Sequence, residues 1–407
     1  MGVLSKSTLA AIAIAVACTG AQAQKQYDTG VSDTEIKIGN TAAYSGPAAA
    51  YGVGGLAWTA FFKMINEQGG INGRKVKFIS YDDAYSPPKT VEQVRKLVES
   101  DEVFMVVEPL GTASNAAIQK YLNVKKVPHV FIGSNSSKWS DPQNYPYSIG
   151  FGTTYRAEAI IYARYILETK PDAKVAVLYQ NDDMGKEYLS GMKEGLGDKA
   201  RTMLVAELPF EITSPTVDSE VVRLKASGAD VLFSAASPKF VAQEIRKLAE
   251  LGWKPLHIVG ITGSYIAASI KPAGFEHSQG IISSSYWKDP LDAQWANDPE
   301  MNAWRAFMTK YYPDGDKGNT LNADAYLRGQ ILVDILKRAG DNLTRDNVMS
   351  LLRSMKDVKS GLLLPGVTVN TGPARPTPVS QTQLMRLKGE QWELFGPIID
   401  SEAGEGK

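Results

Sequence analysis

Short apolar stretches alternate with segments of helical periodicity along most of the chain, and this alternation constrains the fold more than any other feature. In the first part, apolar or alternating stretches predict strands at 35–39, 76–81, 103–107 and 129–133. The segments between them carry apolar residues at helical spacing, at 56–66, from Thr90 onward and at 114–122, and Thr90 is expected to cap its helix. Such alternation is typical of parallel sheets covered by helices.

The same pattern begins again after residue 150. It predicts strands at 174–179, 230–233 and 256–260, and helices at 157–169, 186–196, 217–227 and 239–251. The tail differs, with a strand predicted at 280–283, helices at 299–312, 323–338 and 345–355, and short strands in a Gly- and Pro-rich remainder. A length of 407 residues accommodates two domains, so two α/β lobes are expected.

Residues 1–23 are typical of a cleavable signal peptide. An apolar segment at 9–18 precedes Ala21-Gln22-Ala23, which fits a cleavage site and places the mature start near Gln24. The apolar segment is too short to span a bilayer. Cys18, the one cysteine of the chain, offers lipidation as an alternative, but its surroundings fit a lipoprotein signal poorly. We therefore expect an exported, soluble protein without disulfides.

The composition argues against several classes of function. Lys plus Arg and Asp plus Glu number 44 each, so no charge bias indicates nucleic acid or an anionic membrane. The three histidines lack metal-ligand spacing, and no nucleophile motif is present. The acid pairs Asp82-Asp83 and Asp182-Asp183 fit turns or helix caps better than acid–base catalysis. No catalytic residue, metal or cofactor is predicted.

Small polar residues follow four of the predicted strands. They lie at 111–112 and 133–137 in the first half, and at 234–237 and 260–262 in the second. In open α/β sheets, ligands bind beyond the carboxyl ends of the strands, where free N–H groups at helix N-termini favour anions. Any one hydroxyl here would also serve as a helix cap. Together they predict a pocket for a small anionic solute between two lobes that close by hinge motion.

Several motifs resemble the signature of periplasmic branched-chain amino acid binding proteins, and the match covers essentially the whole mature chain. They are Ser45-Gly46-Pro47 with Tyr51-Gly52, Asn66-x-x-Gly69-Gly70-Ile71-Asn72-Gly73, Tyr81-Asp82-Asp83, and Lys174-Val175-Ala176-Val177-Leu178 with Asp182 and Gly185. The resemblance implies a type I periplasmic binding protein, with two Rossmann-like lobes of parallel sheets joined by a three-stranded hinge. Residues 34–150 and 280–358 would form lobe 1, and 151–279 and 359–401 lobe 2.

The resemblance also implies a function. A monomeric receptor in the periplasm would capture a solute and deliver it to the permease and ATPase of an ABC importer. A ligand-sensing receptor module on the same fold is the alternative from another class. The signal peptide argues against a cytosolic regulator, and the lack of a catalytic constellation argues against an enzyme.

Only half of the family's ligand site maps onto this sequence. The hydroxyls that hold the ligand carboxylate fall on Thr112 and on 134–136, and Tyr51 matches an aromatic wall residue. The glutamate that holds the α-ammonium falls at Thr262, and two tyrosine positions fall on Met184 and Ala236. A buried ammonium without a carboxylate partner is costly, so the cation half of the site is missing.

We therefore favour a carboxylate without an α-amino group, of benzoate or cinnamate type. A branched-chain or other apolar amino acid is the alternative, with Asp182 or Asp183 as a substitute acid, and short amides or urea come third. The expected ligand-binding residues are Tyr51, Gly111, Thr112, Ser134, Asn135, Ser136, Tyr155, Met184, Ala236, Ser237, Thr262 and Tyr286, with Trp287 beside the last of them.

Overall fold

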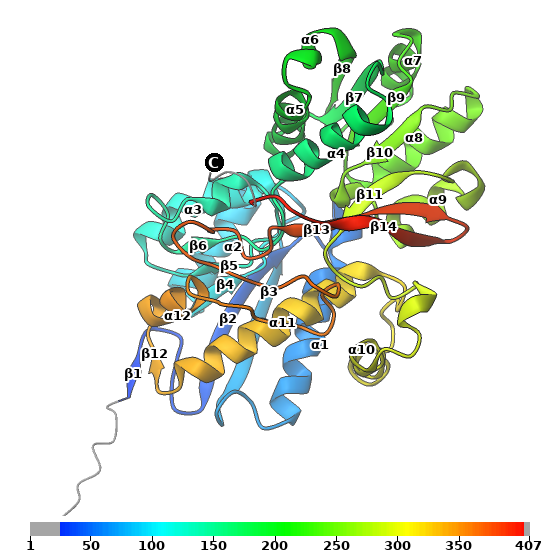
Figure 1. Ribbon diagram of the computed structural model, residues 1–407. Coiled ribbons are helices and arrows are strands. Elements are labelled where there is room, and N and C mark those ends of the chain that lie inside the picture. Colours follow the sequence, from blue (N-terminus) through cyan, green and yellow to red (C-terminus); the bar gives the residue numbers. More distant parts are fainter. Residues whose placement is uncertain (1–24, 403–407) are drawn as a thin grey trace, which may run out of the picture.

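The computed structural model describes residues 25–402, so the expected signal peptide and Cys18 lie outside the described residues. Two sheets form the centres of two lobes (Figure 1). We call the five-stranded sheet and the helices on it lobe 1, and the seven-stranded sheet and its helices lobe 2. The lobe 1 sheet is parallel, in the order β3-β2-β4-β5-β6. Its strands are β2 (Glu35–Ala42), β3 (Lys75–Asp82), β4 (Met105–Val107), β5 (His129–Val130) and β6 (Ser148–Ile149).

Helices cover both faces of the lobe 1 sheet because its central strand is apolar on both sides. Met105 and Val107 of β4 pack into one core, whereas Val106 packs into a second core on the opposite face. The first core includes α1 (Val53–Glu67), α10 (Pro299–Tyr311), α11 (Thr320–Ala339) and α12 (Arg345–Leu352). The second includes α2 (Pro87–Glu99) and α3 (Thr112–Val124).

The lobe 2 sheet is mixed rather than purely parallel, in the order β14-β13-β11-β10-β9-β7-β8. Its parallel strands are β7 (Val175–Gln180), β8 (Leu204–Phe210), β9 (Val231–Ala235), β10 (Leu256–Val259) and β11 (Ile282–Ser285). The hairpin of β13 (Gln381–Lys388) and β14 (Gln391–Asp400) adds two antiparallel strands beyond β11. This hairpin is the red arrow pair of Figure 1.

The lobe 2 helices lie on two faces as well. One core contains α4 (Tyr155–Thr169) and α5 (Asp183–Leu196), and the other contains α7 (Asp218–Ala226) and α8 (Pro238–Glu250). The short helices α6 (Ala200–Met203) and α9 (Lys271–Ala273) complete the lobe. Among the described residues, no helix combines the length and apolarity needed to cross a membrane.

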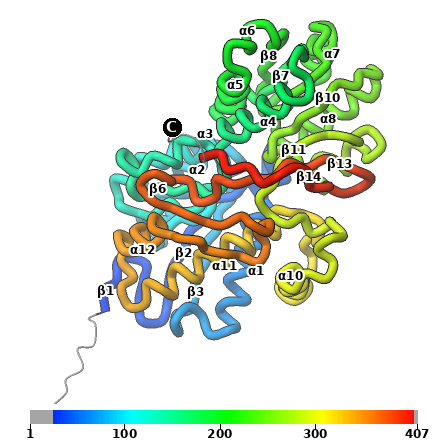
Figure 2. Tube along the Cα trace, in the orientation of Figure 1, coloured from blue at the N-terminus to red at the C-terminus, as the bar shows by residue number. Residues whose placement is uncertain are grey.

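The chain passes between the lobes at three neighbouring places, two of them later in the sequence than expected. The first follows β6, near Gly150. The second follows Ser285 instead of residue 280, because β11 pairs with β10 and β13 in the lobe 2 sheet. The third lies near Ser380 instead of 359. The stretch from 359 to 380 packs on the lobe 1 core, and Figure 2 shows it in orange across that lobe.

Two further elements differ from the sequence-based expectation. Helix α2 begins at Pro87 with Ser86 as its cap, because two prolines at the first positions suit a helix start. Thr90 lies inside the helix, where its hydroxyl donates to Asp83 Oδ2 at 2.8 Å. Strand β8 was not predicted. It is an edge strand, half-exposed along most of its length, and Pro209 removes one N–H from it.

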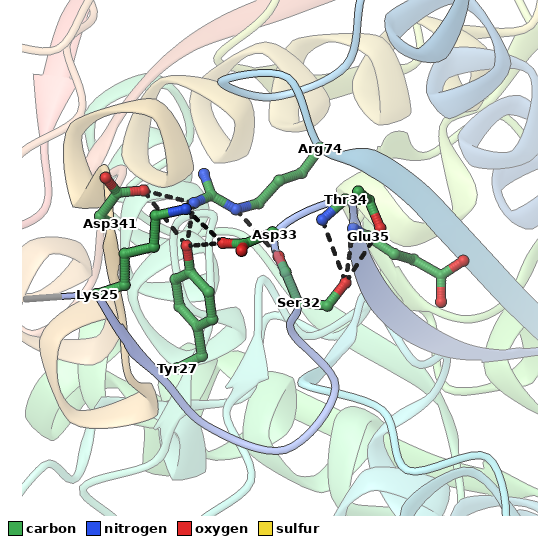
Figure 3. Close-up of polar contacts among 8 residues, drawn as sticks. All are labelled: Lys25, Tyr27, Ser32, Asp33, Thr34, Glu35, Arg74 and Asp341. Atoms are coloured by element: carbon green, nitrogen blue, oxygen red, sulfur yellow. Dashed lines mark hydrogen bonds and ion pairs between the residues drawn. The ribbon is translucent and has the colours of Figure 1, made fainter.

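The start of the described chain is tied to lobe 1. Strand β1 (Gln26–Tyr27) pairs with β12 (Asn342–Leu343) beside α12. Figure 3 shows the buried guanidinium of Arg74, which donates to the Tyr27 hydroxyl, the Asp341 carboxylate and the Ser32 carbonyl oxygen. These contacts fix the start of the described chain on lobe 1, far from the gap between the lobes.

Candidate functional site

An inter-lobe cavity lies at the carboxyl ends of the strands of both lobes. Its empty volume is about 630 Å³, including the part that is open to solvent. The lining residues of lobe 1 and the crossing segments are Tyr51, Tyr85, Glu108, Leu110, Gly111, Thr112, Gly133, Ser134, Asn135, Tyr286, Trp287, Leu321, Asp324 and Arg328. The lining residues of lobe 2 are Tyr155, Met184, Ile261, Thr262 and Tyr265.

Most of the residues singled out in the sequence line this cavity. They are Tyr51, Gly111, Thr112, Ser134, Asn135, Tyr155, Met184, Thr262, Tyr286 and Trp287. Three others lie outside it. Ser136 donates to Glu187 Oε2 at 2.6 Å, Ala236 is fully buried in the lobe 2 core, and Ser237 lies buried just before α8.

Two hydroxyls meet at the N-terminus of α3. Gly111 precedes the helix with φ +96°, and a Cβ at this position would lie 2.5 Å from the Tyr85 ring, so glycine is required. Thr112 Oγ1 lies 2.8 Å from Ser134 Oγ, and the Tyr155 hydroxyl is 3.4 Å from the same oxygen. The first N–H groups of a helix favour an anion, so this corner suits a carboxylate.

Lobe 2 presents a neutral hydroxyl where the resemblance placed an acid. The backbone oxygen of Thr262 accepts a hydrogen bond from the Tyr51 hydroxyl of lobe 1 at 2.8 Å. Its side-chain oxygen is buried and has no hydrogen-bond partner among the described residues. A buried polar atom normally has a partner. Thr262 therefore offers an unused hydrogen bond at the cavity wall.

Asp182 and Asp183 do not replace the missing acid. The Asp182 carboxylate caps α5 by accepting from Gly185 N at 3.1 Å. Asp183 points to the surface, where Lys138 Nζ of lobe 1 lies 2.6 Å from its carboxylate. Neither residue lines the cavity.

Contacts outside the cavity hold the lobes together. Ser136 Oγ and Ser137 N both donate to the Glu187 carboxylate of α5, at 2.6 and 2.7 Å. With the Lys138–Asp183 ion pair these form the rim contacts, which join the loop after β5 to the start of α5. The structure therefore has closed lobes.

Three charged residues of the cavity were missed in the sequence. Arg328 binds the Asp324 carboxylate through Nε and Nη2, at 3.0 and 2.7 Å. Its Nη1 lies 3.6 Å from Glu108 Oε1, and the other oxygen of Glu108 accepts from Trp58 Nε1. Burial raises the pKa of Glu108 to about 7; Arg328 opposes this rise and Asp324 adds to it. Two features of the sequence could have revealed these residues. Glu108 directly follows a strand, and Asp324 and Arg328 form an i,i+4 charge pair within an apolar helix.

The Arg328 guanidinium is held by several protein oxygens. Besides Asp324 and Glu108, it donates to the Phe131 carbonyl oxygen at 3.1 Å and to the Tyr286 hydroxyl at 3.4 Å. It also lies 4.7 Å from the centre of the Phe151 ring. A guanidinium has five N–H donors. Four contacts of Arg328 lie within 3.5 Å, two of them to Asp324, and Nη1 also lies 3.6 Å from Glu108 Oε1. Arg328 is therefore directed mainly at protein oxygens.

Aromatic rings form much of the remaining wall. Tyr51 of lobe 1 meets Tyr265 of lobe 2 edge to face, with ring centres 6.0 Å apart. Tyr286 and Trp287 also meet edge to face, at 4.2 Å. Aromatic side chains offer large, rigid surfaces to a flat apolar ligand.

A second buried glutamate supports lobe 2 from behind the cavity. Glu158 accepts hydrogen bonds from the Tyr162 hydroxyl, the Tyr188 hydroxyl and Ile261 N, the last two at 2.7 Å. Burial raises the pKa of Glu158 to about 7, and these hydrogen bonds oppose the rise. The contact with Ile261 N fixes the backbone that carries Thr262.

Comparisons with known proteins agree with this architecture. The Leu/Ile/Val-binding protein homolog 7 of Brucella abortus (strain 2308) is 24% identical over 272 residues, which cover 63% of this chain and 65% of that protein. The homolog 8 of the same strain is 21% identical and covers 81% of each chain.

Solved structures show the same fold. A branched-chain amino acid ABC transporter protein of Thermus thermophilus with bound valine gives a TM-score of 0.81 at 17% identity, covering 91% of this chain and 97% of that one. A fatty acid ABC transporter substrate-binding protein of Thermomonospora curvata gives 0.78 at 21%, covering 93% and 96%. The model of the family described as periplasmic binding protein matches residues 35–391. This chain, with its type I fold, belongs to the periplasmic binding protein family.

Proposed function

We propose that the protein is the solute receptor of an ABC importer and captures a small carboxylate between its two lobes. In this proposal it is exported with residues 1–23 as a cleavable signal peptide, acts as a monomer and delivers the ligand to a permease and ATPase. The favoured ligand is an aromatic acid of benzoate or cinnamate type.

The observation that carries this proposal is the division of the cavity into an anion corner and aromatic walls. Thr112, Ser134 and the N-terminus of α3 supply donors without a charge of their own. The rings of Tyr51, Tyr265 and Trp287 supply flat apolar surface. A carboxylate in the corner would extend its ring between them.

An apolar amino acid is the second candidate, and one observation favours it. Glu108 places a carboxylate on the cavity wall, although in lobe 1 and not at Thr262. An ammonium group placed against Glu108 would gain the partner that lobe 2 lacks. The relatives named as Leu/Ile/Val-binding proteins agree with this alternative.

A ligand screen separates the candidates. A compound that binds only the folded protein raises its melting temperature by mass action. Mature protein is therefore heated with benzoate, cinnamate, leucine, isoleucine or valine, and the hits are measured by calorimetry. We expect the aromatic acids to raise the melting temperature more than the amino acids. A shift with the amino acids alone would overturn the preference for aromatic acids.

A further inference from the structure

The charges around the inter-lobe cavity do not balance. Its described lining residues include two carboxylates, Glu108 and Asp324, and one cation, Arg328. Asp324 and Arg328 form a close pair through two hydrogen bonds. Glu108 is thus the acid in excess, held by Trp58 Nε1 and by a longer contact to Arg328.

A carboxylate ligand would make this imbalance worse. With Glu108 ionised, its arrival would place a second unpaired negative charge in the cavity, where charge repulsion is only weakly screened. Four contacts within 3.5 Å already direct Arg328 at protein oxygens, so turning this cation to the ligand would break them. One proton added to Glu108 would restore the original charge of the cavity.

We propose that the site binds its carboxylate ligand together with one proton, which is carried by the side chain of Glu108. This inference rests on the proposed function, because it requires a ligand that has a carboxylate and no ammonium group. Protonated Glu108 becomes a hydrogen-bond donor on the cavity wall and keeps an acceptor oxygen for Trp58. The ligand and the proton then add no net charge.

The surroundings of Glu108 agree with a proton-binding role. The ionisable groups that face it are Asp324 and Arg328 of α11 and Tyr265 of lobe 2, and Tyr286 after β11 contacts Arg328. Burial keeps both tyrosines in the neutral form by raising the pKa of each hydroxyl. The pKa of Glu108 itself is raised to about 7, mainly by burial. A proton is therefore available to this carboxylate near neutral pH.

The proposal is tested by measuring the protons taken up on binding. Mature protein is titrated with cinnamate by calorimetry at about pH 8, in phosphate and in Tris, whose ionisation enthalpies differ. We expect an uptake approaching one proton per ligand. We also expect an affinity for cinnamate that falls by up to about tenfold per pH unit above pH 7 and is flat near pH 6.

Two variants locate the proton. Glu108→Gln keeps the size and the hydrogen-bonding ability of the side chain, so it should bind cinnamate without proton uptake and with little dependence on pH. Glu158→Gln is the matched control, because Glu158 is also buried with a pKa near 7 but does not line the cavity. Proton uptake should persist in this control.

The outcomes separate this proposal from the proposed function. Cinnamate binding without uptake, or uptake that survives Glu108→Gln, would overturn the proton site and leave the aromatic acid receptor standing. Leucine binding with proton release, together with no binding of cinnamate, would overturn both, because an ammonium group would then pair with ionised Glu108. Failure of every probe to bind would also count against both.

Discussion

The two walls of the inter-lobe cavity differ in charge. Lobe 1 contributes Glu108, Asp324 and Arg328, whereas the described lining residues of lobe 2 carry no charged side chain. Lobe 2 instead presents a thioether, aromatic rings and the free hydroxyl of Thr262. Under the proposed function, this difference predicts that lobe 1 selects the charge of the ligand and lobe 2 its shape.

The largest expected effect lies in the charged wall. Arg328→Met would leave Asp324 and Glu108 buried without their cation, so the free energy of unfolding should fall by about 3–5 kcal/mol. Urea denaturation measures this. Arg338→Met, at an exposed position of the same helix, is the control and should cost less than about 1 kcal/mol. Equal losses of unfolding free energy in the two variants would show that Arg328 stabilises the protein no more than an exposed arginine does.

The second prediction concerns the pH dependence of stability. The folded protein raises the pKa of Glu108 from the usual 4.5 to about 7, so folding favours its protonated form. The associated stability is present below pH 4.5 and is lost as the pH rises through 7. Relative to Glu108→Gln, the wild type should lose on the order of 1–3 kcal/mol between about pH 5 and pH 8.

Thermal or urea unfolding across this pH range makes the measurement without a ligand. Asp334→Asn, on the exposed part of α11, is the control and should follow the wild-type curve. A constant difference between the wild type and Glu108→Gln would show that Glu108 does not titrate there. The excess negative charge of lobe 1 would then not be neutralised by protonation of Glu108.

The third prediction compares one hydroxyl from each wall. In the proposed complex the Thr112 hydroxyl bonds the ligand carboxylate, so Thr112→Val should weaken the binding of an aromatic acid by about 1–3 kcal/mol. Thr262→Val should weaken it by less than about 1 kcal/mol, since lobe 2 does not hold the carboxylate. Both changes keep the side-chain volume nearly constant, and calorimetry gives the affinities. A larger loss of affinity in Thr262→Val than in Thr112→Val would show that lobe 2 binds the carboxylate.

The smallest effect is expected at the rim contacts. Glu187→Gln weakens two hydrogen bonds from lobe 1 at a position that solvent reaches, so the closed form should lose less than about 1 kcal/mol. Stopped-flow measurement should show ligand dissociation accelerated by less than about fivefold. Lys138→Met tests the neighbouring ion pair in the same way. A larger acceleration would show that the rim contacts contribute substantially to the free energy of lobe closure.

The sequence was informative where local pattern decides position. The alternation of strands and helices predicted the lobes, and the strand ends predicted that Thr112, Ser134 and Thr262 would lie at one cavity, because parallel strands end at the same edge of a sheet. Ser136 and Ala236 were misplaced, since the direction of a side chain in a loop depends on packing.

The charged cluster could not be predicted in the same way. Asp324 and Arg328 were recognisable as an i,i+4 pair in α11, but nothing local indicates that this helix packs beside the end of β4. The pairing of β11 with β13 likewise joins segments about a hundred residues apart, so the later crossing points were not predictable. Long-range packing decided both features.

The weakness of the rim contacts has a consequence for the proposed opening and closing of the lobes. Exposed ion pairs and hydrogen bonds such as Lys138–Asp183 and Ser137–Glu187 contribute little, so the rim itself adds little to the stability of the closed form. In the proposed receptor, the balance between open and shut forms would then depend mainly on contacts inside the cavity, such as that of Tyr51 with Thr262, and on the ligand. Such a receptor would report its cargo through its shape.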